Sequence, residues 1–264
     1  MFDLGPTINS PHNDKVRWVK SLQRRKVRHL ERRFVVEGVR LLEDALKAGC
    51  VPVLVLWNSE EALSRRAEAL LQRLLGLTPE VYPVGSHIIK LLSDTVTPQG
   101  LVAVFPFVEL EPVRRELVLI LDGIQDPGNF GTLLRSAEAA GVDQVILAPG
   151  TVDVFNPKVV RAGGGAHFRL PLAQQSWTEI QATVRGLRTR LADTRSRLAY
   201  YAVDWRCPAA LIVSNEGAGP SAEASKLAAE RVAIPMRGGV ESLNVSVAGS
   251  IVLFEAARQK AQNP

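Results

Sequence analysis

The sequence predicts an α/β fold in two domains. Three observations carry this prediction: short β-type runs alternate with helical patterns over the first hundred residues, the alternation restarts at Leu117, and a Pro-bounded segment separates the two stretches. The second stretch indicates a parallel sheet, because residues 117–121 are continuously apolar, as in strands buried on both faces. We therefore expect domains at 1–105 and 117–264, joined by a linker at 106–116.

The individual elements follow from apolar runs and their spacing. Residues 130–140 place apolar side chains at i, i+3, i+4 and i+7, the pattern of an amphipathic helix, and Gly141 ends it. The last helix, expected at 243–259, is apolar almost all round, which indicates cover by the sheet on one side and by a second subunit on the other. The other expected strands are 34–36, 51–57, 81–84, 101–105, 144–147, 190–192, 210–214 and 232–234, and the other helices 39–48, 60–75, 86–92 and 177–187.

Composition excludes several classes of protein. The 264 residues are 46% hydrophobic and 22% charged, which is ordinary globular composition and excludes a disordered, collagenous or coiled-coil chain. The longest apolar stretch, at 245–254, is interrupted by Ser and Gly and is too short to span a bilayer. Only Cys50 and Cys207 occur, so neither a disulfide framework nor a Cys-rich zinc site can form. We expect a soluble protein in the reducing cytoplasm, without a membrane partner.

Positive charge is concentrated in two segments of a chain whose net charge is +5. Residues 15–33 hold nine Lys and Arg against the single acid Glu31, and residues 185–206 hold six Arg against Asp193 and Asp204. Each run alone could be a solvated helix face. Two separate basic segments favour a phosphate backbone as partner.

Common catalytic motifs are absent from the sequence. It has no phosphate-binding loop, no dinucleotide-binding glycine motif, no H-E-x-x-H and no G-x-S-x-G, and its four histidines have no metal-ligand spacing. Three polar, glycine-bearing loops remain, each after a predicted strand of the second domain, where open α/β sheets bind ligands. Taken singly, the first two have ordinary explanations: Asn129 as a helix N-cap and Arg135 as a surface arginine in the first loop, and a plain turn in the second.

Taken together, the three loops form an ordered set of motifs. They read Asn129-x-Gly131-x-x-x-Arg135, Asn215-Glu216-Gly217-x-Gly219, and Ile234-Pro235-Met236 followed by Glu241-Ser242-Leu243-Asn244-Val245-Ser246-Val247. Over residues 117–258 the chain thus resembles the SpoU/TrmH family of S-adenosylmethionine-dependent RNA ribose 2′-O-methyltransferases, in the SPOUT superfamily. Residues 32–45 resemble, less specifically, the ribosomal-protein-like RNA-binding domain that precedes this catalytic domain in many members. Two departures are visible: Gly163-Gly164 stand where the family commonly has Ser and a larger residue, and Ser214 replaces a frequent glycine.

The resemblance implies a fold and a set of site residues. The C-terminal domain would carry a deep trefoil knot, and two copies would pair as a homodimer through the final helix. S-adenosylmethionine would lie in the knot and leave as S-adenosylhomocysteine, and no metal is required. The strand end at 192–193 is a further candidate for the cofactor site. The implied cofactor-binding residues are Ser214, Asn215, Gly217, Ile234, Met236 and Leu243, and the implied catalytic residues are Asn129, Arg135, Glu216, Ser242 and Asn244.

Arg135 is the residue that the family places beside the target ribose. Because a guanidinium stays protonated in proteins, Arg135 is a poor base. We expect it to hold an RNA phosphate and the developing 2′-oxyanion, while the phosphate or Glu216 accepts the proton. Asn129 and Asn244 would orient these groups, and Ser242 would hold its loop in place.

The expected substrate is structured RNA, and the added N-terminal domain favours large-subunit ribosomal RNA. A transfer RNA 2′-O-methyltransferase and a catalytically idle RNA-binding protein of the same fold are the alternatives. The intact set of five catalytic residues argues against an idle protein. A nucleotide-dependent oxidoreductase is disfavoured by the missing dinucleotide motif.

Overall fold

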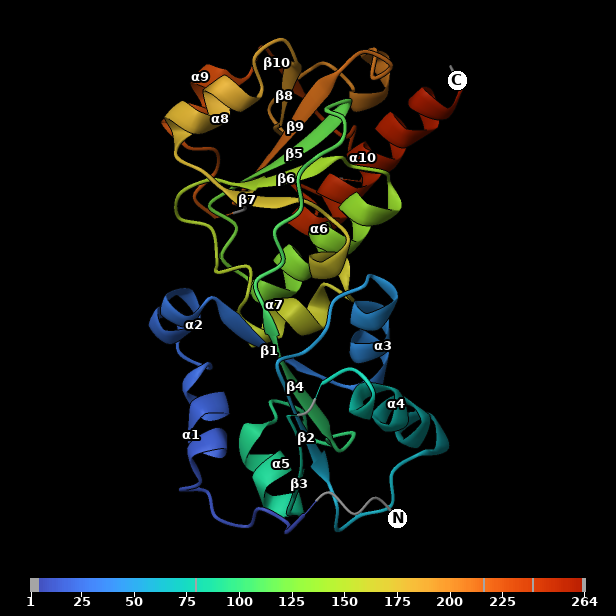
Figure 1. Ribbon diagram of the computed structural model, residues 1–264. Helices are drawn as coiled ribbons and strands as arrows, with labels where there is room; N and C mark the ends of the chain where they lie inside the picture. Colours follow the sequence, from blue (N-terminus) through green and yellow to red (C-terminus); the bar gives the residue numbers. More distant parts are fainter. Residues whose placement is uncertain (1–4, 79, 216, 239, 263–264) are drawn as a thin grey trace. The chain divides into compact units, whose positions relative to one another are not determined.

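The computed structural model describes residues 5–78, 80–215, 217–238 and 240–262 (Figure 1). Two compact units are present: the first combines the chain up to Val108 with Asp153–Phe168, and the second combines Glu109–Val152 with the chain from Arg169 onward. The domains expected from the sequence assign 153–168 to the second domain, whereas packing assigns this segment to the first unit.

The first unit is built on a four-stranded sheet with the order β1-β4-β2-β3. Strand β4 pairs antiparallel with both β1 and β2, and β2 pairs parallel with β3. In this register Phe34 lies opposite Phe105, and Leu56 lies opposite Val102. The strands are β1 (Arg33–Glu37), β2 (Leu54–Asn58), β3 (Val81–Val84) and β4 (Leu101–Pro106).

Helices cover both faces of this sheet. Figure 1 shows α1 (Asp14–Ser21) and α5 (Ser86–Leu92) on one face, and α3 (Val39–Lys47) and α4 (Arg65–Leu75) on the other. The short helix α2 (Arg25–Glu31) precedes β1. The helix expected at 60–75 begins only at Arg65, because the Ser64 hydroxyl accepts a hydrogen bond from the Ala67 amide at 3.2 Å and caps the helix there.

The segment 153–168 completes the aromatic core of the first unit. It contains α7 (Pro157–Ala162) and the 3₁₀ turn η1 (Ala166–Phe168), neither of which was expected from the sequence. Phe155 and Phe168 are buried in one cluster with Phe34, and the Phe155 ring stacks on Phe107 with ring centroids 3.7 Å apart. Because aromatic side chains bury large areas, the core of this unit depends on a segment remote in sequence.

A buried ion pair also holds this segment. The guanidinium of Arg28 donates to the Asp153 carboxylate, with Nε 3.1 Å from Oδ2, and the two side chains are only 3% and 5% exposed. Arg28 Nη1 donates to the carbonyl oxygens of Leu22 and Gln23 at 2.8 and 2.7 Å. Counting Arg28 within the basic surface was therefore wrong, because its charge is used inside the protein.

The described part of the second unit contains a six-stranded, wholly parallel sheet with the order β10-β8-β9-β5-β6-β7. The predicted α/β class and parallel sheet are confirmed. Every residue of β5 is buried, as expected for a strand at the centre of the sheet. Strand β7 was not expected, and β10 ends two residues before the expected strand does. The strands are β5 (Leu117–Asp122), β6 (Gln144–Leu147), β7 (Leu172–Gln174), β8 (Arg188–Ala192), β9 (Ala209–Ser214) and β10 (Glu230–Val232).

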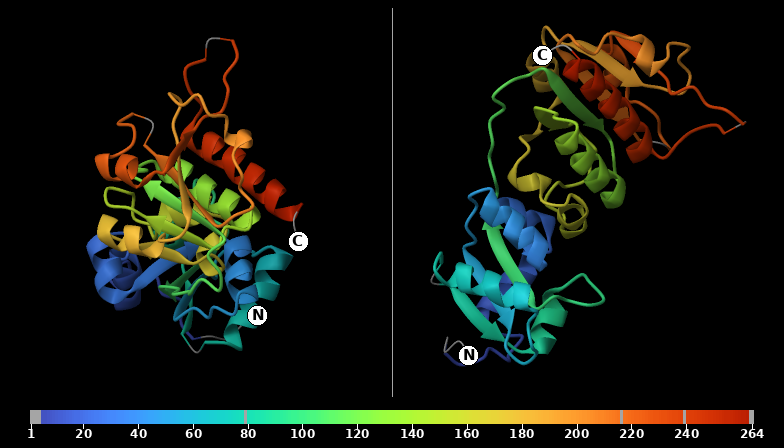
Figure 2. Two further views of the ribbon diagram at one scale, coloured as in Figure 1. Left: turned by 90° about the horizontal axis from the view of Figure 1, so that it is seen from above. Right: turned by 90° about the vertical axis from the view of Figure 1, so that its right-hand side faces the viewer.

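Helix α10 (Val245–Ala261) packs against α6 (Pro127–Ala139) and β9, and Figure 2 shows it beside α6. Gly249 permits this approach, since a Cβ there would lie 2.5 Å from Leu133 Cδ2. Val247 and Phe254 stay 46% and 49% exposed, so apolar side chains of α10 reach the surface. Two shorter helices, α8 (Trp177–Thr183) and α9 (Ala222–Leu227), complete this unit's α-helices in the described residues. Over the same residues, no helix is both long and apolar enough to cross a membrane.

Candidate active site

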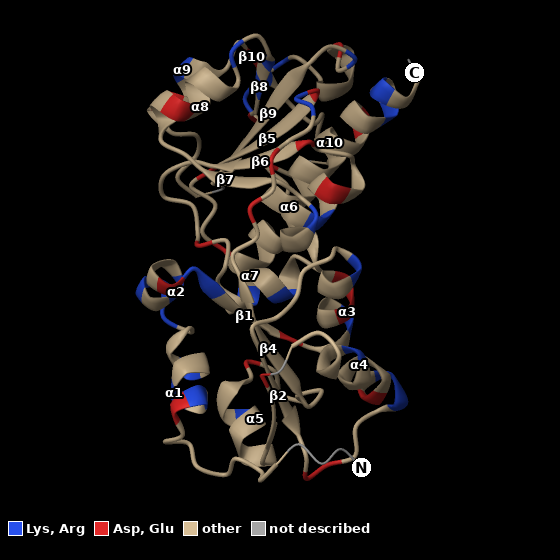
Figure 3. Cartoon of the chain, in the orientation of Figure 1, with Lys and Arg blue, Asp and Glu red and all other residues tan. Residues whose placement is uncertain are grey.

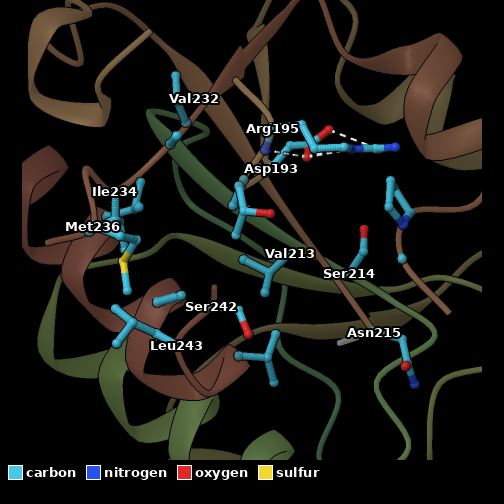
Figure 4. A pocket seen from close by; sticks show the side chains of 18 of the residues that line it. Asp193, Arg195, Val213, Ser214, Asn215, Val232, Ile234, Met236, Ser242 and Leu243 are labelled. Atoms are coloured by element: carbon cyan, nitrogen blue, oxygen red, sulfur yellow. Dashed lines mark hydrogen bonds and ion pairs between the residues drawn. The ribbon is translucent and has the colours of Figure 1, made fainter. Parts of the chain in front are cut away.

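A cavity of about 420 Å³ opens at the carboxyl ends of β8, β9 and β10 in the second unit (Figure 4). Its walls come from residues 192–195, 213–215 and 217–220, and from nine residues that lie between Val232 and Val252. The six residues expected to bind a cofactor all line it: Ser214, Asn215, Gly217, Ile234, Met236 and Leu243. The three strands are adjacent and parallel, which explains why loops distant in sequence meet at one edge.

The cavity has an apolar side and a polar side. Figure 4 shows Ile234, Met236 and Leu243 together on one side, with Ser214 and Asn215 on the other. Apolar walls with a few placed polar groups are typical of small-molecule sites, and the volume falls in the usual range for them.

Asn215 organises the loop that follows β9. Its Oδ1 accepts hydrogen bonds from the amides of Gly217 at 2.8 Å and Ala218 at 3.1 Å, while its Nδ2 donates to the Gly123 carbonyl at 3.0 Å. The side chain therefore shapes the turn and ties it to the end of β5. Its neighbour Glu216 lies outside the described residues.

A buried carboxylate holds both ends of the same loop. Asp122 is 4% exposed, and its Oδ2 accepts from Ser214 Oγ and from the Ser221 amide, both at 2.9 Å. The hydroxyl of Ser214 is thus bound to the protein, although Ser214 lines the cavity. Sequence reasoning missed Asp122; its signal was a carboxylate at the carboxyl end of a continuously apolar strand.

A charged pair stands at the end of β8. Asp193 Oδ1 accepts from Arg195 Nε at 3.1 Å, and Asp193 Oδ2 accepts from Arg231 Nη1 at 2.5 Å. The hydrogen bonds from Arg195 lower the pKa of Asp193 to about 2, against the opposing effect of burial. Asp193 and Arg195 both line the cavity, so this wall carries fixed charges at neutral pH.

The first and third sequence motifs touch at the start of α10. Asn244 Oδ1 caps this helix by accepting from the Ser246 amide at 3.0 Å, and Asn244 Nδ2 donates to Asn129 Oδ1 at 2.9 Å. Ser246 Oγ also donates to Asn244 Oδ1 at 2.6 Å. The structure therefore joins two of the five expected catalytic residues directly, and adds Ser246 as a partner that the sequence reasoning had not singled out.

Asn129 is not the N-cap of α6, as had been expected. Asp126 caps this helix, because its Oδ1 accepts from the Asn129 amide at 2.7 Å. The Asp126 cap shifts the helix start three residues toward the N-terminus. It also leaves the Asn129 side chain in the first turn, where it meets Asn244.

The remaining expected catalytic residues are placed differently from one another. Ser242 lines the cavity. Arg135 lies on the exposed surface of α6, six residues after Asn129; it does not line the cavity and makes no hydrogen bond or ion pair with another described residue. In the described part of the chain, no cluster of three or more His, Cys, Asp or Glu side chains could hold a metal ion.

The two basic segments differ once folded. Figure 3 shows Lys and Arg along α1 and α2, where Lys20, Arg24 and Arg25 are exposed. In the second segment, Arg190 is fully buried with its Nε 2.9 Å from Glu230 Oε2, and other arginines pair with Asp193 and Asp204. Ion pairs therefore engage three of the six arginines in the second segment, and the first segment is the stronger candidate for binding a polyanion.

Comparisons with known proteins cover both units. Residues 116–254 match the family model described as the SpoU rRNA Methylase family, and residues 13–103 match the MRM3-like substrate binding domain. The chain is 32% identical to the 23S rRNA (guanosine(2553)-2'-O)-methyltransferase RlmP of Bacillus subtilis, over 94% of this chain and 97% of that protein. It is 33% identical to the mitochondrial rRNA methyltransferase 3 of Homo sapiens, over 89% of this chain and 70% of that protein.

A solved structure has the same fold over nearly the whole chain. The SpoU methyltransferase AviRb from Streptomyces viridochromogenes, in complex with AdoMet, matches with a TM-score of 0.87 and 28% identity, over 96% of this chain and 100% of that one. The resemblance inferred from the three motifs is confirmed: this chain belongs to the SpoU rRNA methylase family.

Proposed function

We propose that this protein transfers the methyl group of S-adenosylmethionine to a ribose 2′-hydroxyl of ribosomal RNA, with large-subunit RNA as the favoured substrate. The observation that carries the proposal is the cavity at the carboxyl ends of β8, β9 and β10, which gathers the second and third family motifs. The names of the relatives support the same activity: one is a 23S rRNA 2′-O-methyltransferase and the other an rRNA methyltransferase.

The cavity fits this cofactor chemically. Ile234, Met236 and Leu243 offer an apolar surface for the adenine ring. Backbone groups around Gly217 suit the ribose hydroxyls, since a Cβ at that position would meet only Asn215 Oδ1, at 3.6 Å, and so the backbone stays open to a ligand. The charges of Asp193 and Arg195 complement the amino and carboxylate groups of the methionine part. S-adenosylmethionine supplies, when bound, an electrophilic methyl group.

The protein's own residues would position the acceptor ribose and stabilise charge. Arg135, which pairs with no described residue, is available to an RNA phosphate and to the oxygen that becomes negative as its proton leaves. The Asn129–Asn244 pair connects the helix that carries Arg135 to the loop that carries Ser242. The proton acceptor is the RNA phosphate or Glu216. Positioning and charge stabilisation supply most of the rate in this scheme.

The deep trefoil knot is part of this proposal. Its support is the order of the elements: β10 lies at one edge of the sheet, and the next described helix, α10, packs on α6 and on the inner strand β9. A knot further requires that the returning chain pass through the loop formed by an earlier connection. Knots are rare, so the fold alone would not suggest one.

A homodimer through α10 is the proposed assembly. Val247 and Phe254 are half exposed and stand seven residues apart, which places them on one face of the helix. A second copy of α10 would cover these side chains. The proposed location is the cytoplasm, which rests on the low cysteine content.

The first unit is proposed to bind the RNA. Exposed Lys and Arg on α1 and α2 would contact phosphates, which position an RNA without reading its sequence. Truncation before residue 106 is a poor test of this role, because it would strip the aromatic cover from Phe155 and Phe168. Alanine substitution of Arg24, Arg25 and Lys26 together should instead weaken RNA binding and flatten its salt dependence, with cofactor affinity unchanged.

The decisive experiment is methyl transfer with a mapped product. The protein is incubated with labelled S-adenosylmethionine and, separately, with protein-free large-subunit RNA, small-subunit RNA and transfer RNA, and the modified nucleotide is mapped. We expect one 2′-O-methylated nucleotide in large-subunit RNA. A Gly217→Phe variant should stay folded and lose cofactor binding. Methylation confined to transfer RNA, methylation of a base, or no transfer to any RNA would each contradict the proposal.

A further inference from the structure

The loop that follows β9, with described residues 214–215 and 217–221, lies beside the end of strand β5 (the β9 loop). The two strands are parallel neighbours, and their register sets Asp122 beside Ser214. The β9 loop forms one wall of the cavity at the carboxyl ends of β8, β9 and β10, whereas Asp122 and Gly123 do not line that cavity. The end of β5 therefore acts on a ligand there through the β9 loop.

Asp122 holds the β9 loop at both ends. Its Oδ2 accepts from Ser214 Oγ and from the Ser221 amide, both at 2.9 Å, and its backbone carbonyl accepts from the Asn215 amide at 3.0 Å. Because Asp122 is only 4% exposed, solvent screens these charge-assisted bonds little. Removal of the carboxylate would release both ends of the loop and leave the backbone contact in place.

Thr151 fixes the same strand end from the loop that follows β6, the other neighbour of β5. Thr151 is 7% exposed, and its Oγ1 accepts from the Gly123 amide at 3.1 Å and donates to the Leu121 carbonyl at 2.8 Å. Gly123 has a φ of +67°, in the left-handed region that favours glycine, and its carbonyl accepts from Asn215 Nδ2 at 3.0 Å. The Thr151 hydroxyl thus fixes the residue whose carbonyl holds Asn215.

We propose that Asp122 and Thr151 are positioning residues for the cofactor, which hold the β9 loop in the conformation that binds S-adenosylmethionine. Asn215, held through Gly123, accepts from the amide of Gly217, and both Asn215 and Gly217 line the cavity. A loop that is already fixed in its bound conformation loses little entropy when the ligand arrives, which raises affinity. The identity of the ligand as S-adenosylmethionine rests on the proposed function.

The second unit offers a matched control for each positioning residue. Asp143 Oδ2 accepts from two backbone amides at the start of β5, at 2.7 and 2.9 Å. Thr189 is 6% exposed, and its Oγ1 donates to a backbone carbonyl at 2.6 Å and accepts from a backbone amide at 3.0 Å. Neither control residue lines the cavity. Their substitution removes the same kinds of hydrogen bond at sites away from the ligand.

The test compares full-length Asp122→Ala and Thr151→Val with Asp143→Ala and Thr189→Val. Thr151→Ser is the rescue variant, because serine keeps the hydroxyl. The readouts are the Kd of S-adenosylhomocysteine by titration calorimetry, the KM of S-adenosylmethionine and kcat on large-subunit RNA, and stability by urea unfolding. Thr151→Val replaces one hydroxyl by a methyl group, so it decides the test if Asp122→Ala does not fold.

Asp122→Ala should raise Kd and KM about tenfold or more, and Thr151→Val about threefold to tenfold, because the loop must then be ordered on binding. At saturating cofactor kcat should change little, since the residues that contact the RNA are untouched. Thr151→Ser should keep wild-type affinity. Both controls should also keep it, although their stability falls.

Unchanged cofactor affinity in folded Thr151→Val and Asp122→Ala, or an equal loss in the controls, would overturn the proposal, since these contacts would then serve stability alone. Hydrogen exchange of the Gly217 and Ala218 amides in the ligand-free protein follows the loop itself, and it should become faster in Asp122→Ala and Thr151→Val only. If the wild type binds no S-adenosylhomocysteine, the proposed function fails, and this exchange alone decides whether Asp122 and Thr151 position the loop.

Discussion

The two units use their ionised side chains in opposite ways. In the first unit, Arg28 and Asp153 face each other inside the core and together hold a segment that is remote in sequence. In the second unit, Asp193 and Arg195 pair at the wall of a cavity, where a ligand can reach them. Both carboxylates are 5% exposed, so the two pairs differ in their arginines: Arg28 is 3% exposed and Arg195 is 71% exposed.

This difference separates an ion pair that stabilises the fold from one that can bind a ligand. A charge buried with a single partner is costly to leave alone, so it couples parts of a core. The Arg195 guanidinium, by contrast, is largely solvated and can exchange its contacts for those of a ligand. The same residue types therefore indicate a structural role in the first unit and a binding role in the second. Four substitutions test this distinction, beginning with the largest expected effect.

Asp153→Ala should destabilise the protein by about 3–5 kcal/mol, because it leaves the Arg28 guanidinium buried without a counter-charge. Urea unfolding measures the loss. The double variant Arg28→Met, Asp153→Leu should recover much of it, since apolar side chains then fill the site. Asp14→Ala, an exposed acid in α1, should change stability by less than about 0.5 kcal/mol. A loss for Asp153→Ala no larger than that of Asp14→Ala would remove the contrast between the units.

Arg135→Ala should lower kcat by about 100-fold or more, the scale for losing one preorganised donor to a developing oxyanion, with cofactor affinity near wild type. Stability should change by less than about 0.5 kcal/mol, because Arg135 is exposed. Arg135→Lys tests geometry, since lysine keeps the charge and loses the planar fork. Arg73→Ala, at an exposed position of α4, is the control. Near-normal turnover in Arg135→Ala would end the proposed role.

His167 should make stability depend on pH. Burial lowers the pKa of His167 from 6.5 to about 4, so the folded protein holds the ring neutral where the unfolded chain binds a proton. The free energy of unfolding should be independent of His167 protonation above pH 6.5. Between pH 6.5 and 4 it should fall by up to about 1.4 kcal/mol per pH unit. His167→Phe should lack this slope, while His12→Phe, at an exposed site, should keep it. Identical slopes in wild type and His167→Phe would contradict the assignment.

Gly249→Ala should have the smallest effect, a loss of about 1–3 kcal/mol from overpacking, offset in part by the better helix propensity of alanine. The added Cβ would lie 2.5 Å from Leu133 Cδ2, and either α10 or α6 must shift. Gly76→Ala is a control, because a Cβ there meets only the Arg73 carbonyl, at 3.6 Å. Thermal unfolding compares the two variants. An equal or higher Tm for Gly249→Ala would show that the helices are not in close contact at this point.

One departure from the family pattern has a structural reason. A Cβ at Gly163 would lie 2.8 Å from His167 Cε1 and 3.1 Å from the Val159 carbonyl oxygen. The buried His167 ring therefore occupies the space that a serine would need. The departure was visible in the sequence, but its cause lies in the packing of a side chain four residues away.

Much of the local structure followed from the sequence. Strands 81–84 and 144–147 and helix 86–92 were predicted with the bounds observed, because each is a short apolar run between turn residues. Two of the three loops identified in advance, the second and the third, line the cavity, since parallel strands bring their carboxyl ends to one edge. These inferences needed only neighbouring residues and the topology that their pattern implies.

Other features were decided by the tertiary structure alone. The burial of Arg28, the placement of 153–168 in the first unit and the Asn129–Asn244 contact each join residues more than 100 positions apart. Local periodicity carries no information on such pairs. Whether an arginine is solvated or buried depends on whether a distant carboxylate reaches it, because burial of a charge is tolerated only with its partner in place.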